Sequence, residues 1–272
     1  MKKICSILLV FSFVFFLSFP ILSLAETNTS EQLDKGETAD FYLTMRNLLQ
    51  VYLSELENGK ITEEEFAEKV KENIGSQLQT NEDVNELMES ENKVMQPMGL
   101  SYDYDFGAFG VKATEIVLFA KNPIDASRAK SLAEDALKEA QDRYKDYTLW
   151  QGNGDAFRHA YWSALMTKHI NRDFAYEAGY AHEGYKTGSY DDIKSLDVKM
   201  DIKNNYSGRI LGTKYKSKSD NYIAEKVADE VSKGNMVRIR TYTSGKPTDY
   251  IDGVPTKYMG KFVPTSDGGR YY

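Results

Sequence analysis

Residues 153–169 read NGDAFRHAYWSALMTKH, and this stretch indicates the fold class of the whole chain. Small side chains at Ala156, Ala160, Ser163 and Thr167 recur three or four positions apart, which places them on one face of a helix. A face of small side chains lets another helix approach closely. We therefore predict a tightly packed helix here, with Asn153 as its cap.

The flanking segments repeat this pattern. Asn122-Pro123 predicts the start of a helix, because proline is favoured in a first turn, and five alanines follow on one face: Ala126, Ala129, Ala133, Ala136 and Ala140. A further helix with small residues is predicted around 174–185, and an amphipathic one over 221–233. Residues 111–120 fit a buried helix or a strand equally well. The core, taken as 98–235, is therefore predicted to be a helical bundle.

An acidic helical arm is predicted over residues 39–97. One helix begins near Thr38–Asp40 and ends at Asn58-Gly59, and a capping box of Thr62 and Glu65 starts the next. A third helix is expected over 81–95, before Pro97. The arm reads as a hairpin or small bundle that acts as a spacer or a dimerising element.

The last segment, 236–272, changes character. Val237, Ile239 and Thr241 alternate with polar residues, and turn sequences follow, which is typical of short strands or an extended wrap. The predicted fold class is mostly α: a helical bundle core with an N-terminal helical hairpin or arm and a short β-like C-terminal tail.

Residues 1–25 are predicted to be a secretory signal peptide. Lys2 and Lys3 precede an apolar run over 7–22, and Ser23 and Ala25 supply the small residues of a cleavage site. The alternative is an uncleaved membrane anchor, for which the run is short. No later segment is apolar enough to span a membrane, so the mature chain, with a flexible leader at 26–38, is expected to be secreted, extracellular or cell-wall associated.

Composition limits the chemistry. The single cysteine, Cys5, lies in the predicted signal, so the mature chain would hold neither a disulfide nor a thiolate metal site. The formal net charge is -7, and residues 26–97 carry 17 acids against 6 bases, whereas 214–272 carry 7 against 11. General nucleic-acid binding is not expected from such an acidic chain.

Polar residues gather in three clusters inside the predicted core. Asp155 and His159 are four positions apart on one helical face, followed on that stripe by Trp162, so the carboxylate can co-ligate a metal or orient the imidazole. Both residues also have a structural interpretation, as a first-turn acid and a buried histidine bonded to it. His169 falls near a helix end and is interpreted as structural.

The second cluster is His182-Glu183, and the third combines Asp201, Asn205 and Arg209. His182 lies on a small-residue stripe, and Glu183 follows it as a ligand, a base or a solvated acid. Carboxylate and amide oxygens suit a hard cation or a fixed hydrogen-bond network, and arginine suits a phosphate or carboxylate. A buried polar network is the alternative interpretation of this cluster.

Together, these side chains predict a divalent metal site for zinc, manganese or calcium, with no other cofactor expected. The predicted metal ligands are Asp155, His159, His182, Asp201 and Asn205. The predicted catalytic residues are His159 and Glu183, and the predicted substrate contacts are Arg158, Trp162 and Arg209.

The three clusters resemble an uncharacterised bacterial domain family found in secreted and toxin-associated proteins. The shared motifs are DAFRHAYW from Asp155, the His182-Glu183 pair and the block from Met200 to Arg209, and the resemblance covers about 149–209. Many relatives carry histidine where this chain has Lys203, which bears on activity if that histidine binds metal or moves protons. A fainter similarity to secreted phospholipases A2 lies in Arg158-His159, but Ala160 stands where those enzymes have an acid.

The sequence thus predicts a secreted protein with a metal-dependent hydrolase site, acting on phosphoesters of lipid or nucleic acid. The alternative is a non-catalytic extracellular or cell-envelope-associated binding protein, in which the same polar residues form a buried network. The partner would be an extracellular substrate in the first case and an envelope component in the second.

Overall fold

The computed structural model describes residues 37–80, 82–86, 111–239, 242–243, 246–247, 262–266 and 268. The predicted signal peptide and nearly all of the predicted leader lie outside these residues, as does the predicted boundary at 97–98. The chain divides into two compact units, 1–33 and 34–272, and all of the described residues belong to the second.

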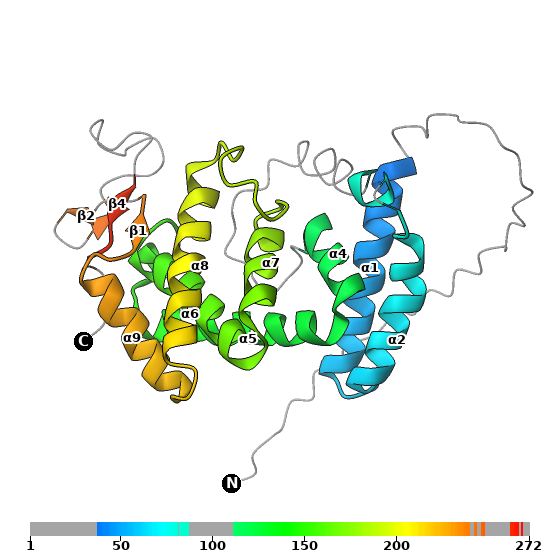
Figure 1. Ribbon diagram of the computed structural model, residues 1–272, viewed down its shortest axis with the longest axis horizontal. Helices are drawn as coiled ribbons and strands as arrows, with labels where there is room; N and C mark the ends of the chain where they lie inside the picture. The colour runs from blue at the N-terminus through cyan, green and yellow to red at the C-terminus, as the bar shows by residue number, and fades with distance from the viewer. Residues whose placement is uncertain are drawn as a thin grey trace, which may run out of the picture. The chain divides into compact units, whose positions relative to one another are not determined.

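The described chain is mostly helical, which confirms the predicted fold class (Figure 1). Its main helices are, in order, α1 (Glu37–Glu57), α2 (Glu63–Asn73), α4 (Ala113–Lys121), α5 (Pro123–Arg143), α6 (Asn153–His169), α7 (Arg172–His182), α8 (Leu196–Lys214) and α9 (Asp220–Ser232). Two 3-10 turns, η1 (Gly75–Gln77) and η3 (Asp146–Thr148), join them, and residues 82–86 are also helical.

Local sequence signals set several helix starts. The capping box is present, with the Glu65 amide donating to Thr62 Oγ1 at 3.1 Å and the Thr62 amide donating to Glu65 Oε2 at 2.8 Å. The ambiguous segment 111–120 becomes helix α4, in which Glu115 accepts a hydrogen bond from the Lys112 amide at 2.8 Å. A reaching-back glutamate of this kind satisfies an amide that the helix itself leaves without a partner.

The predicted cap at Asn153 is wrong. Gly152 is the N-cap of α6, and Asn153 is the first helical residue. The Asn153 side chain is instead fully buried and bonds the tail, donating to the Ser266 carbonyl at 2.9 Å and accepting from the Ser266 amide at 3.1 Å. Asn153 does not cap α6 because its side chain bonds Ser266, a partner far away in the sequence that local patterns do not reveal.

Helix α6 is the centre of the core. It packs against α5, α7, α8 and α9, and all but three of its residues are buried. The contact with α8 is especially close, because a Cβ added at Gly208 would lie under 3.0 Å from the backbone of Ala160, and one at Gly212 equally close to Ala164. The predicted small-residue face of α6 thus meets two glycines on α8.

Helices α1 and α2 share the same hydrophobic core. Tyr42, Met45 and Leu49 of α1 and Phe66 and Val70 of α2 are buried in one cluster with side chains of α4, α5 and α6. Acidic residues on their outer sides pair with bases of α5, as in Glu63–Arg128 at 3.0 Å and Glu57–Lys130 at 2.7 Å. The acidic arm therefore packs against α4 and α5, which in turn contact α7 and α6.

Short strands form the tail. β1 (Val237–Arg238) pairs antiparallel with β4 (Val263–Pro264), Val237 opposite Pro264, and β2 (Tyr242–Thr243) pairs with β3 (Lys246–Pro247). Asn204 of α8 holds β1 in place, donating to the Val237 carbonyl at 2.8 Å and accepting from its amide at 3.1 Å. The strand character predicted at Val237 is confirmed, and Thr241 lies outside the described residues. At Ile239 the prediction is wrong: this residue lies in a bend after β1, where its amide donates to the Gln151 carbonyl at 3.0 Å.

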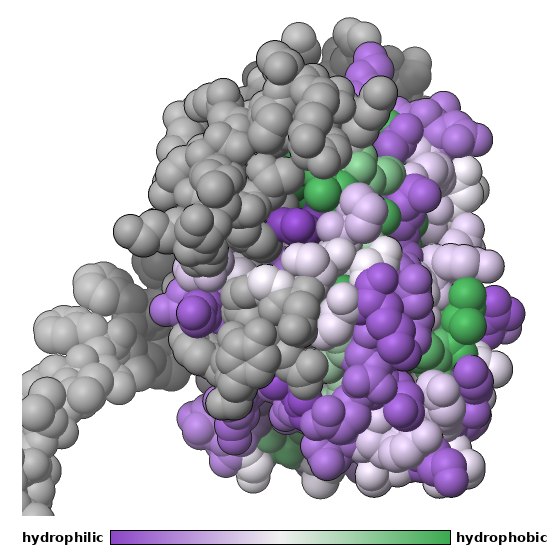
Figure 2. Space-filling model, turned by 90° about the vertical axis from the view of Figure 1, so that its left-hand side faces the viewer, coloured by the Kyte–Doolittle hydropathy of each residue, from purple (hydrophilic) through white to green (hydrophobic). Residues whose placement is uncertain are grey.

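The surface of this end of the unit is mainly hydrophilic where it is coloured, with small separated green areas (Figure 2). Among the helices of the described ranges, none has the length and apolar character needed to cross a bilayer.

The α6–α8 contact yields a stability prediction. Replacing Gly208 with alanine should destabilise the protein by about 1–3 kcal/mol, because the new methyl group forces the two helices apart. Urea denaturation of Gly208→Ala measures this loss. Gly75→Ala is the matched control, since its added Cβ would meet no atom closer than 3.7 Å. Equal midpoints for the two variants would contradict the close approach.

Candidate functional site

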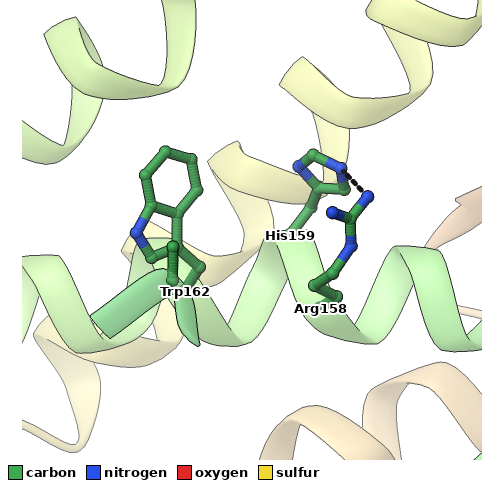
Figure 3. A pocket seen from close by; sticks show the side chains of 4 residues that line it. Arg158, His159 and Trp162 are labelled. Atoms are coloured by element: carbon green, nitrogen blue, oxygen red, sulfur yellow. Dashed lines mark hydrogen bonds between the residues drawn. The ribbon is translucent and has the colours of Figure 1, made fainter. Parts of the chain in front are cut away.

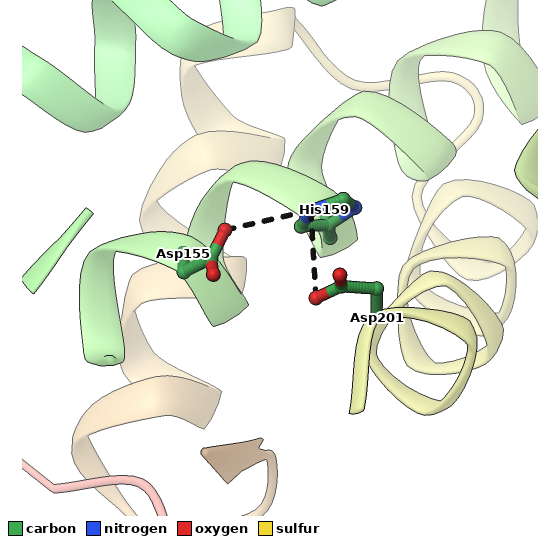
Figure 4. A group of neighbouring side chains, drawn as sticks. All are labelled: Asp155, His159 and Asp201. Atoms are coloured by element: carbon green, nitrogen blue, oxygen red, sulfur yellow. Dashed lines mark ion pairs between the residues drawn. The ribbon is translucent and has the colours of Figure 1, made fainter. Parts of the chain in front are cut away.

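Three of the predicted ligands converge between α6 and α8. His159 lies between two carboxylates (Figure 4), with its Nε2 3.4 Å from Asp155 Oδ1 and 3.5 Å from Asp201 Oδ1. The three ligand atoms all lie within 4.8 Å of one another. The side chains are buried, with exposures of 2% for Asp155, 3% for His159 and 6% for Asp201.

These separations fit a divalent cation. Ligand atoms about 2.1 Å from a tetrahedral ion lie about 3.4 Å apart, which matches both histidine–carboxylate distances. Asp201 Oδ1 is buried without a hydrogen-bond partner in the described chain, so it is available as a ligand. One imidazole and two carboxylates are also a ligand set that zinc and manganese accept.

Two further acids act electrostatically on this cluster. Glu183, at the end of α7, is buried, and Asp197 lies one turn before Asp201 on α8. Burial and repulsion from Asp155 and Glu183 raise the pKa of Asp197 to about 7 and hold the pKa of Asp201 well above its usual range. Carboxylates crowded in this way resist ionisation until a cation compensates them.

The pKa values of the α6 pair move downward. Burial, followed by the charge of Arg158, lowers the pKa of His159, so its imidazole is neutral at pH 7, the form that ligates metals. Burial opposes ionisation of Asp155, but Arg158 and His159 more than offset it, and the pKa of Asp155 falls. Asp155 is therefore the permanent anion of the cluster.

Arg158 lies directly beside the cluster. Its Nη2 donates to Asp155 Oδ1 at 2.5 Å and approaches His159 Nε2 at 2.9 Å. Figure 3 shows Arg158, His159 and Trp162 around a small recess that Ala133 also lines. Trp162 is fixed there, because its indole N–H donates to the Ala129 carbonyl at 2.8 Å. One side of His159 therefore faces a small recess bordered by a cation and an aromatic ring.

Gln151 is a site residue that the sequence analysis missed. Its φ of 57° puts it in the left-handed region, and its amide donates to Asp155 Oδ2 at 2.6 Å. Its side chain, 2% exposed, hydrogen-bonds Asp197, and its Oε1 has no partner in the described chain. A strained backbone beside crowded acids is typical of a functional site. No sequence pattern marks a non-glycine residue for this conformation.

Asp197 was also missed, although a signal for it exists. It precedes Asp201 by four positions, the same spacing that singled out Asp155 and His159. Two such pairs on neighbouring helices form one buried group of titratable side chains.

His182 is not brought into the three-residue group. Its Nδ1 lies 3.1 Å from Glu115 Oε1, and its ring packs on Trp162, with the ring centroids 5.2 Å apart. Its centroid is 6.1 Å from that of His159. Burial opposes ionisation of Glu115, but the hydrogen bond with His182 lowers its pKa overall. His182 thus neighbours the cluster and holds a partner of its own.

The remaining predicted residues lie further along α8. Asn205 packs against Gly179, and neither of its side-chain polar atoms has a partner in the described chain. Arg209 lies beside the Tyr176 ring of α7, two helical turns beyond Asp201. Lys203 is exposed, with its Nζ over the Phe262 ring, so this position faces away from the cluster.

Residues 116–235 match the model of a family described as a domain of unknown function, DUF6973. The match is consistent with an uncharacterised domain family, and it contains all of the predicted site residues. No curated protein and no solved structure matches the chain.

The crowded carboxylates yield a pH prediction for the metal-free protein. Unfolded, Asp201 loses its proton near pH 4, whereas the folded chain retains it to higher pH, so its contribution to stability falls as pH rises above 4. Asp201→Asn should therefore stabilise the protein at pH 8 by about 1–2 kcal/mol, and less at pH 5. Denaturation in the presence of a chelator measures both. Asp229→Asn, a half-buried acid paired with Lys226, is the control, and a loss of stability in Asp201→Asn at both pH values would contradict the crowding.

The backbone of Gln151 yields a second prediction. Alanine and glycine both remove its side chain, but only glycine adopts a positive φ freely. Gln151→Gly should therefore be more stable than Gln151→Ala by about 1 kcal/mol. Chemical denaturation measures the difference in stability between the two variants. Equal stability would contradict the positive φ at this position.

Proposed function

We propose that this protein is a secreted metal-dependent hydrolase whose substrates are phosphoesters. The observation that carries the proposal is the convergence of Asp155, His159 and Asp201 at ligand-to-ligand distances that suit one divalent cation. The recess beside His159 marks the side from which a substrate would have to reach the cluster.

Each side chain has a role in this proposal. Asp155, His159 and Asp201 would hold the cation, which would supply Lewis acidity for attack on phosphorus. Glu183 and Asp197 are the nearby carboxylates that take a proton from the attacking water and return one to the leaving alcohol. Water adds to phosphorus, the ester P–O bond breaks, and the alcohol leaves protonated.

Arg158 has two states in the proposal. In the metal-free protein it neutralises Asp155, with its Nη2 near the position that a shared cation would take. A cation held by the cluster would compete with the guanidinium for Asp155, and the freed Arg158 would be suited to contact an anionic phosphoryl group at the recess that it lines with Trp162. Arg158 is therefore both a competitor of the metal and a substrate contact.

The same arginine favours the alternative function, a non-catalytic binding protein. Arg158 already pairs with Asp155, and His182 already pairs with Glu115, as expected of a buried polar network. Under this alternative, the cluster fixes the α6–α8 packing and binds no metal.

Metal titration distinguishes the two functions. The parent chain, purified without chelator, should bind one zinc or manganese ion in calorimetry, and His159→Ala should weaken that binding by at least about 100-fold. Arg158→Met should strengthen it, because the competing internal cation is gone. His169→Ala is the control, since His169 pairs with Asp220 at 2.9 Å and belongs to no metal group of the described chain.

Hydrolysis of a chromogenic phosphodiester should require the bound metal ion. Activity that appears with metal, disappears in His159→Ala and persists in His169→Ala would support the hydrolase. No binding of zinc, manganese or calcium to the parent or to Arg158→Met would overturn it, and a large loss of stability in Arg158→Met would favour the buried network.

A further inference from the structure

Arg209 is a buried cation that no acid among the described residues neutralises. Its side chain is 4% exposed, yet no carboxylate in the described chain pairs with it. The acids of the adjacent helix, Asp173 and Glu177, are exposed and form no ion pair with it. A buried charge is normally paired, so an unpaired guanidinium points to a ligand that supplies the negative charge.

Tyrosine rings surround this guanidinium. It lies 5.1 Å from the centroid of Tyr176 on α7 and 5.8 Å from that of Tyr206 on α8. Tyr180, which hydrogen-bonds Tyr176, adds a third aromatic ring. Rings contact the guanidinium, while its five N–H donors, which lie in its plane, remain suited to a forked contact. Tyr206 is 53% exposed, so one wall of this cage reaches solvent.

The tyrosines do not act as counter-anions. Burial, followed by the neighbouring Tyr176, raises the pKa of Tyr180, so its phenol is neutral at pH 7. Burial, followed by the charge of Arg172, lowers the pKa of Arg209, but an arginine remains protonated at that pH. The cage therefore keeps its positive charge.

A second cation lies near Arg209. Arg172 is the first residue of α7, one turn before Tyr176, and it is exposed. The N-terminal end of an 11-residue helix adds the positive end of its dipole. Two guanidinium groups and tyrosine hydroxyl donors match a doubly charged tetrahedral anion better than a single carboxylate.

We propose that the α7–α8 face around Arg209 and Arg172 is a phosphate-binding site. It is separate from the acid cluster, because Arg209 follows Asp201 by eight residues, about 12 Å along α8. One phosphoryl group cannot touch both places. The site holds either free phosphate or the terminal phosphate of a larger molecule, and it does not depend on the proposed hydrolase.

Calorimetry with inorganic phosphate tests the site, using the full chain without its predicted signal and with chelator present. The parent should give a saturable isotherm with one phosphate per chain. Arg209→Met should weaken it at least about tenfold, and Arg172→Met about threefold, since an exposed charge is screened. Arg209→Lys, which keeps the charge but loses the fork, should also weaken binding, and it covers the case in which the methionine variant does not fold.

The matched control is Arg128→Met, which removes an exposed arginine that pairs with Glu63 on α2. It should bind phosphate like the parent. Phenyl phosphate is then titrated in place of inorganic phosphate. Equal affinity for the two would indicate a site for the terminal phosphate of a larger molecule, and binding of inorganic phosphate alone would indicate a site for the free anion. A parent that shows no saturable binding, or Arg209→Lys and Arg172→Met with parental affinity, would overturn the site.

Metal titration of Arg172→Met and Arg209→Lys keeps the two proposals apart. Both variants should bind metal like the parent. If the parent chain binds metal but not phosphate, only the phosphate-site proposal is refuted. If it binds phosphate but not metal, only the hydrolase proposal is refuted.

Discussion

The close approach of α6 and α8 is the constraint on which the site depends. Gly208 and Gly212 offer no side chains, so α8 lies directly against the backbone of Ala160 and Ala164. This contact fixes the rotation and height of α8 relative to α6, and therefore brings Asp201 to 3.5 Å from His159. Larger residues in the contact would separate the imidazole from its second carboxylate without touching either.

The cluster stores electrostatic strain that the surrounding fold supports. Burial and repulsion from neighbouring carboxylates raise the pKa of Asp197 and Asp201, whereas Arg158 and His159 lower the pKa of Asp155. A scaffold has no use for such crowding, since apolar residues of similar size would pack at least as well. The left-handed backbone at Gln151, directly bonded to Asp155, adds a second cost at the same place. Both costs are understandable if a cation binds there.

Charge is distributed unevenly over the helices that carry these groups. The facing sides of α6 and α8 collect acids, whereas the outer side of α8 toward α7 holds Arg209 in a cage of tyrosines. One helix thus presents carboxylates to one neighbour and a guanidinium to another. A cation and an anion suit these two faces respectively, which is the basis of the two proposals.

The sequence by itself determined most of the helices, because capping boxes, prolines and small-residue periodicity act within one or two turns, but it left 111–120, which forms α4, open between helix and strand. Spacing of four also paired Asp155 with His159 and Asp201 with Asn205 as ligand candidates, but the predicted metal set included His182 and Asn205, which the structure does not bring into the three-residue group. The sequence did not determine the hydrogen-bond partners of two side chains. Asn153 bonds the distant Ser266 and does not cap α6, and His182 pairs with Glu115 of α4. Only the tertiary structure decided these pairings, the conformation of Gln151 and the separation of Arg209 from the acids, because each depends on how helices far apart in the sequence pack together.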